Sequence, residues 1–121
     1  MKIIIQFKFL KYTFFFSALI FSASSFAYDP YDCLNDVAKI DTKIPIGLAT
    51  QLCSATWSSE PVICYAGTSL VDKEMPRGLA IELCAGSVDA KKTLECYAKS
   101  GNRKLNRGLA TTLCGANKIK N

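Results

Sequence analysis

The sequence predicts an all-α protein made of three short helical hairpins, each closed by one disulfide. Three observations carry this prediction: a ten-residue block occurs three times, its apolar residues fall four apart, and one cysteine precedes each block while another ends it. The blocks are IPIGLATQLC, MPRGLAIELC and LNRGLATTLC, ending at Cys53, Cys84 and Cys114. A unit that recurs about every 31 residues is typical of repeat architectures, so we expect repeats over residues 28–60, 61–92 and 93–121.

The first 27 residues differ from the rest and predict a cleaved signal peptide. Lys2, Lys8 and Lys11 precede an apolar stretch over residues 13–21, and small residues then lead to Ala27. This order of charged, apolar and small segments is the pattern of a secretory signal. The alternative is an uncleaved anchor, but a membrane-spanning helix needs about 20 apolar residues. We therefore expect cleavage after Ala27 and a secreted or periplasmic mature chain without a transmembrane anchor.

The first half of each repeat is expected to form a helix that begins beside a cap. Cys33, Leu34, Val37 and Ile40 form an apolar stripe at helical spacing. The counterparts in the second and third repeats are weaker, and in the third we expect only one or two turns. Candidate capping residues, or acids that complement the helix dipole, lie just before or at the start of the first two of these helices: Asp29, Ser59 and Glu60.

The second half of each repeat is expected to form an amphipathic helix that ends at a cysteine. Ile44, Leu48 and Leu52 fall four apart, as one face of a helix requires. Prolines near the start are tolerated because the N–H that they lack has no partner in a first turn. Two positions are singled out for packing: a leucine expected to be buried in all three copies, and a glycine expected to let helices approach closely. These residues are Leu48, Leu79 and Leu109, and Gly47, Gly78 and Gly108.

All six cysteines lie in the expected mature chain, which predicts a disulfide framework. In an antiparallel hairpin, the start of the first helix meets the end of the second. This geometry favours one bond inside each hairpin, although six cysteines permit 15 connectivities and Cys53–Cys64 or Cys84–Cys96 are alternatives. Closing a loop of about 20 residues contributes about 3 kcal/mol in the chain-entropy model. The favoured pairs are Cys33–Cys53, Cys64–Cys84 and Cys96–Cys114.

The residue types argue against metal, cofactor and enzyme chemistry. The chain has no histidine and no C-x-x-C pair, so the common zinc ligand sets and the Ser-His and Cys-His nucleophile pairs are missing. Asp29, Asp32 and Asp36 lie at helical spacing near one helix start. Acids at that place ordinarily complement the helix dipole, so we prefer this interpretation to the carboxylate pair of a hydrolase.

Charge changes along the expected mature chain and is the one feature that points to a partner. Without the signal lysines the chain holds 12 basic and 10 acidic residues, which is too even a balance to predict nucleic-acid binding. Residues 28–60 carry a net charge of −3 and residues 93–121 carry +5. The predicted binding patch for an anionic surface or an acidic protein consists of Tyr97, Lys99, Arg103, Lys104 and Arg107, with Lys118 and Lys120 further along.

Two other uses of this charge gradient stay open. The basic residues could form an ordinary solvated face, or the acidic first repeat could pair head-to-tail with the basic third repeat of another copy. Ile46, Arg77 and Arg107 occupy one repeat position with different chemistry, which favours binding over a uniform structural role. The sequence therefore predicts a non-catalytic binding module, with a structural envelope component as the alternative and a secreted hydrolase as a less favoured third.

Overall fold

The computed structural model describes residues 27–116, and all of the regular secondary structure in this part of the chain is helical. The all-α prediction is confirmed. A short 3-10 helix, η2 (Gly101–Arg103), follows the fifth helix. The signal-peptide prediction, apart from Ala27 itself, and Lys118 and Lys120 lie outside the described residues. In chain order the α-helices are α1 (Pro30–Ile40), α2 (Ile46–Cys53), α3 (Glu60–Val71), α4 (Arg77–Cys84), α5 (Ala90–Ser100) and α6 (Arg107–Cys114).

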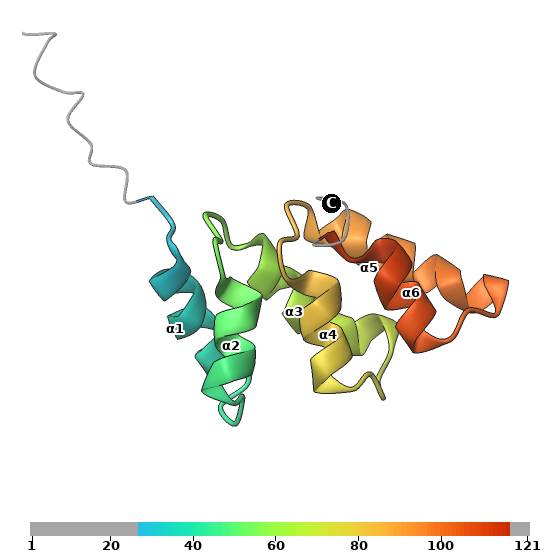
Figure 1. Cartoon of the computed structure of the whole chain (residues 1–121), viewed down its shortest axis with the longest axis horizontal. Coiled ribbons are helices and arrows are strands. Elements are labelled where there is room, and N and C mark those ends of the chain that lie inside the picture. Colours follow the sequence, from blue (N-terminus) through green and yellow to red (C-terminus); the bar gives the residue numbers. More distant parts are fainter. Residues whose placement is uncertain (1–26, 117–121) are drawn as a thin grey trace, which may run out of the picture.

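Consecutive helices form pairs, and the pairs follow one another along the long axis of the molecule (Figure 1). We call α1 with α2 the first pair, α3 with α4 the middle pair, and α5 with α6 the third pair. Helix α3 contacts both α1 and α5, while α4 contacts both α2 and α6. This part of the chain therefore forms two layers of helices with the core between them, and among its three pairs only the middle one has a neighbour on each side.

One disulfide joins the two helices of each pair, and no cysteine is left free. The bonds are Cys33–Cys53, Cys64–Cys84 and Cys96–Cys114, with Cα–Cα distances of 5.4 to 5.7 Å. These are the pairs that the hairpin geometry favours: Cys33 and Cys64 lie in the first half of their helices, Cys96 lies just past the middle of α5, and each second cysteine ends the next helix. Cys33, Cys53, Cys64 and Cys84 are also buried in the core.

The helices of the first layer begin at caps that only partly match the predicted ones. Asp29 caps α1 in a reciprocal arrangement with Asp32, and each side chain accepts a backbone N–H of the other residue. Helix α5 begins after Asp89, whose side chain accepts from the backbone N–H of Lys92. With 11 residues, α5 is longer than the one or two turns expected. Burial of Thr93 and Tyr97 against the core explains the extra length, since tertiary packing stabilises short helices more than propensity does.

Burial along the second-layer helices differs from the predicted pattern. Leu48 and Leu79 are half-buried and Leu109 is 55% exposed, so the expectation of one buried position in three copies is wrong. The apolar residues that begin the blocks precede the helices, which start after Pro45, Pro76 and Asn106. The fully buried leucines lie one turn later, at Leu52 and Leu83.

The glycines of the recurring blocks do not bring helices together. A Cβ atom added at Gly47 or Gly78 would meet nothing within 4 Å, so the expected packing role is wrong for these glycines. Close approach occurs instead at Gly67 of α3, where an added Cβ would lie 2.5 Å from Leu94 Cδ1 of α5. Glycine at this position therefore lets the side chain of Leu94 rest on the α3 backbone.

Candidate binding surface

Two residues of the predicted basic patch bind an aspartate inside the molecule. The Tyr97 hydroxyl donates to Asp72 Oδ2 at 2.8 Å, and Arg107 donates through Nε to Oδ2 at 2.7 Å and through Nη2 to Oδ1 at 3.1 Å. Asp72 is the C-cap residue that follows α3, whereas both donors belong to the third pair. Tyr97 and Arg107 thus join the third pair to the middle pair and are occupied within the fold.

The electrostatics of this cluster agree with its geometry. The guanidinium of Arg107, with help from the Tyr97 hydroxyl, lowers the pKa of Asp72 from 3.8 to about 2. Burial and the bond to the Asp72 carboxylate raise the pKa of Tyr97 to about 12. Both groups therefore keep their ordinary charge states at neutral pH, which suits a structural contact better than a proton-transfer site.

The same arrangement joins the middle pair to the first pair. Asp41 is the C-cap residue that follows α1, and its carboxylate accepts from Tyr65 at 2.7 Å and from Arg77 at 2.8 and 3.1 Å. The Tyr65 hydroxyl and the Arg77 guanidinium lower the pKa of Asp41. We call each set of one aspartate, one tyrosine and one arginine an inter-pair tie. Since Arg77 and Arg107 both belong to such ties, their difference from Ile46 is no longer an argument for an external partner.

The two ends of the row lack the residues that would continue these ties. In the first pair, Leu34 and Ile46 stand at the tyrosine and arginine positions. In the third pair the aspartate position corresponds to Lys104 when counted from Cys96 and to Asn102 when counted back from Leu105, and neither residue is acidic. A copy stacked onto either end in the same geometry would therefore form no further tie.

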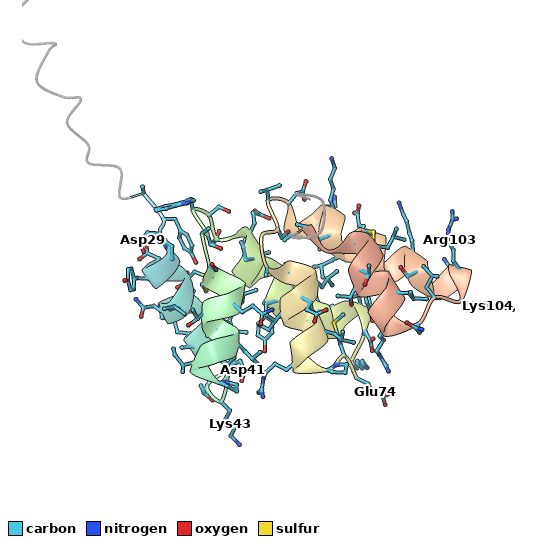
Figure 2. The ribbon with its side chains drawn as sticks, viewed as in Figure 1. Asp29, Asp41, Lys43, Glu74, Arg103 and Lys104 are labelled. Carbon is cyan, nitrogen blue, oxygen red and sulfur yellow. A yellow bond between two sulfur atoms is a disulfide. The ribbon has the colours of Figure 1, made fainter. Side chains whose placement is uncertain are left out.

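The other predicted site residues, Lys99, Arg103 and Lys104, are exposed at the free end of the third pair. Figure 2 shows Arg103 and Lys104 at the end of the row opposite Asp29, pointing away from the helices. Within residues 27–116, none of the three belongs to a salt bridge. The structure thus divides the predicted patch into two occupied residues and three that face solvent.

An apolar hollow of about 220 Å³ lies beside these cations. Lys99 and Arg103 stand at its edge, while Leu105, Leu113 and Cys96 supply apolar walls. Leu113 is 65% exposed, and within residues 27–116 no further helix packs on that side of the third pair. We define the end surface as the cations and leucines gathered here, namely Lys99, Arg103, Lys104, Leu105 and Leu113.

Lys104 adopts a backbone conformation that is unusual for its residue type. It follows η2 with φ 57° and ψ 29°, in the left-handed region. This conformation costs a residue with a Cβ atom about 1 kcal/mol and is easy for glycine. A lysine at this turn is therefore not explained by local backbone preference.

The acidic residues of the first pair have local structural roles. Asp29 and Asp32 form the cap of α1, and Asp36 accepts from the Tyr28 hydroxyl at 3.0 Å and lies 3.5 Å from Lys39 Nζ. Burial and the contact with Asp36 raise the pKa of Tyr28 to about 12. The contacts of Asp29 and Asp32 agree with the interpretation of these acids as complements of the helix start.

Two surface features were missed by the sequence reasoning. One is an apolar groove between α3 and α5, with a volume of about 520 Å³. The other is a recess of about 480 Å³ between the loops that connect the pairs, beside the exposed side chains of Trp57 and Val88. The signal for the groove was present in the sequence, because Ile63 and Leu70 stand where the first repeat has Asp32 and Lys39.

Comparison of the chain with family models, curated proteins and solved structures finds no match. In the described range, no helix has both the length and the apolar character needed to cross a bilayer. The same part of the chain holds no group of three or more potential metal-ligating side chains. The functional argument therefore depends on the geometry and charge of the surfaces.

Proposed function

We propose that the protein is an exported, non-catalytic binding module of three helical-hairpin repeats, and that its end surface contacts an anionic partner. The observation that carries the proposal is the contrast among the basic residues of the third pair. Arg107 is bound to Asp72, whereas Lys99, Arg103 and Lys104 face solvent, and Lys99 and Arg103 line an apolar hollow.

Recurring contacts support the repeat architecture. The disulfides close segments with sequence separations of 20, 20 and 18 residues, and the inter-pair tie occurs twice with matching donors and acceptors. A unit that repeats both its internal crosslink and its contact with the next unit is how a solenoid is stabilised. The disulfides support export as well, since they persist mainly in oxidising compartments.

The chemistry of the end surface defines the class of partner. Two lysines and one arginine attract negative charge, and the arginine can bind a phosphate or carboxylate through two parallel hydrogen bonds. The exposed Leu113 and the half-buried Leu105 beside them favour a partner that has apolar surface next to its anionic groups. An anionic membrane surface or an acidic amphipathic protein meets both requirements.

Binding to phospholipid vesicles tests this proposal. The oxidised protein should bind vesicles that contain phosphatidylglycerol, and the binding should weaken with salt because exposed charges are screened beyond about 8 Å at physiological ionic strength. The triple variant Lys99→Gln, Arg103→Gln, Lys104→Gln should bind roughly a hundredfold more weakly, since each basic residue contributes about 1 kcal/mol near an anionic surface. Polyglutamate serves as a second probe, for an acidic protein partner.

A matched variant controls for loss of charge in general. Lys39, Lys43 and Lys73 are exposed and belong to the first and middle pairs or the loops within them, so replacing all three with Gln removes the same charge. This control should keep most of the binding. Equal loss in the two triple variants, or binding that does not respond to salt, would overturn the proposed contact.

A further inference from the structure

The groove between α3 and α5 is apolar along nearly its whole lining. Ile63, Gly67 and Leu70 of α3 face Leu94 and Ala98 of α5 across about 520 Å³. The charged residues in the lining are Lys91 and Glu95, both on the rim formed by α5. Gly67 sets the depth of the groove, because it lets Leu94 lie directly on the α3 backbone.

This apolar character is a property of α3 and is not shared by α1. Thirty-one positions before Ile63, Ala66 and Leu70, the chain has Asp32, Asn35 and Lys39. Helix α3 is also apolar on its inner side, where Val62 and Cys64 are buried. A helix that is apolar on opposite sides is usually covered on both sides. The outer side of α3 is uncovered, because Leu70 is 87% exposed and Ile63 is 51% exposed.

We propose that a second copy of this chain covers the groove, forming a two-fold symmetric dimer in which α3 and α5 of one copy face those of the other. A two-fold interface uses the same surface on both subunits, so that surface must be complementary to itself. This face carries both a projecting side chain, Leu70, and an apolar groove able to receive it. Each copy thereby inserts its Leu70 into the groove of its partner.

The charges on the rim are complementary in the same way. Lys91 and Glu95 lie one turn apart on α5, with Nζ and Oε1 3.9 Å apart, and both are mostly exposed. When two α5 helices run antiparallel across a two-fold axis, Lys91 of each copy lies opposite Glu95 of the other. The rim therefore forms two equivalent ion pairs around an apolar centre, which is the usual anatomy of a protein interface.

A dimer of this kind also closes on itself. Contacts between the unlike ends of the row would be heterologous and would extend into open filaments, whereas a two-fold contact ends at two copies. The inference does not depend on the proposed function, since no residue of the end surface lies in the groove.

Sedimentation equilibrium of the protein with its disulfides intact tests the dimer. The wild type should sediment as a dimer that dissociates on dilution, and Leu70→Glu should raise the dissociation constant at least a hundredfold by placing a carboxylate in the apolar centre. Val88→Glu is the matched control, because Val88 is 86% exposed on a loop outside the groove. A monomeric wild type, or equal effects of the two substitutions, would overturn the proposal.

Exchange of the rim charges is the sharper test. Lys91→Glu and Glu95→Lys should each weaken self-association roughly tenfold, because each sets like charges against one another. An equimolar mixture of the two variants should associate as tightly as the wild type, since every Glu then faces a Lys. Failure of the mixture to recover, or a monomer that binds an apolar dye in the groove, would overturn the dimer in favour of a ligand site.

Discussion

The middle and third helix pairs contain nearly the same ten-residue block but bury it differently. Leu83 is fully buried, whereas Leu113, at the same place in its block, is 65% exposed. The middle pair is covered by α2 on one side and by α6 on the other, while among the described helices the third pair has a neighbour on one side only. The comparison shows that one sequence pattern forms core or surface depending on what packs against it.

A second position differs between the two pairs in polarity, although it is buried in both. Ile81 is fully buried in α4, and its equivalent in α6 is Thr111, which is 1% exposed. Among the described residues, Thr111 Oγ1 is a buried polar atom without a hydrogen-bond partner. The third pair thus carries a polar group where the middle pair carries an aliphatic one, and its free face is where we place the contact with a partner.

The largest expected difference between the two pairs comes from truncating these leucines. Leu83→Ala should lower the free energy of unfolding by about 3 to 5 kcal/mol, because a cavity between two covering layers cannot collapse. Leu113→Ala should cost less than about 1 kcal/mol, as is usual for exposed positions. Urea denaturation of the oxidised protein measures both values. Similar losses at the two leucines would mean that the third pair is covered in solution.

Breaking the inter-pair ties should have an intermediate effect. Asp72→Asn removes the carboxylate that joins the third pair to the middle pair, and Asp41→Asn does the same between the middle and first pairs. Each substitution should destabilise the protein by about 1 to 2 kcal/mol. Hydrogen bonds to charged groups are stronger than those between neutral groups, but solvent weakens an ion pair that is partly exposed. If Asp72→Asn unfolds like the wild type in urea, the tie contributes nothing to the junction.

The same tie should make stability depend on pH in a definite direction. Asp72 has its pKa lowered from 3.8 to about 2, so its contribution is present above pH 4 and is lost as the pH falls toward 2. Tyr97 has its pKa raised from 10.0 to about 12, so its contribution is present below pH 10 and is lost as the pH rises toward 12. In Asp72→Asn both losses should shrink, which urea denaturation at pH 2, 4, 7 and 11 would reveal.

The smallest expected effect is a gain in the third pair. Thr111→Val replaces a buried hydroxyl that has no partner with a methyl group and should stabilise the protein by about 1 kcal/mol. Ile81→Thr introduces the same hydroxyl into the middle pair and should destabilise it. Thermal denaturation of both variants checks the signs, and a loss of stability in Thr111→Val would mean that the hydroxyl is satisfied in solution.

Much of the local structure followed from the sequence because it depends on short-range chemistry. The spacing of the apolar residues placed second-layer helices at the recurring blocks, and Asp29 was recognisable as a cap for α1. The position of each cysteine relative to its helix favoured the bond formed within each pair. These inferences need only helix geometry and the fact that the ends of an antiparallel hairpin meet.

Only the tertiary structure decided which residues face a neighbour, because that depends on contacts between segments about 31 residues apart. The sequence predicts Arg107 and Tyr97 as surface ligands, but in the fold they donate to Asp72 Oδ2 at 2.7 and 2.8 Å. Lys99, Arg103 and Lys104 remain exposed at the free end. Leu109 follows the same stripe as Leu79 yet is exposed, since a periodic pattern specifies a face of the helix but not what covers it. The sequence by itself determined the helices and the likeness among the three blocks, whereas stacking decided which copy of each residue became core, tie or binding surface.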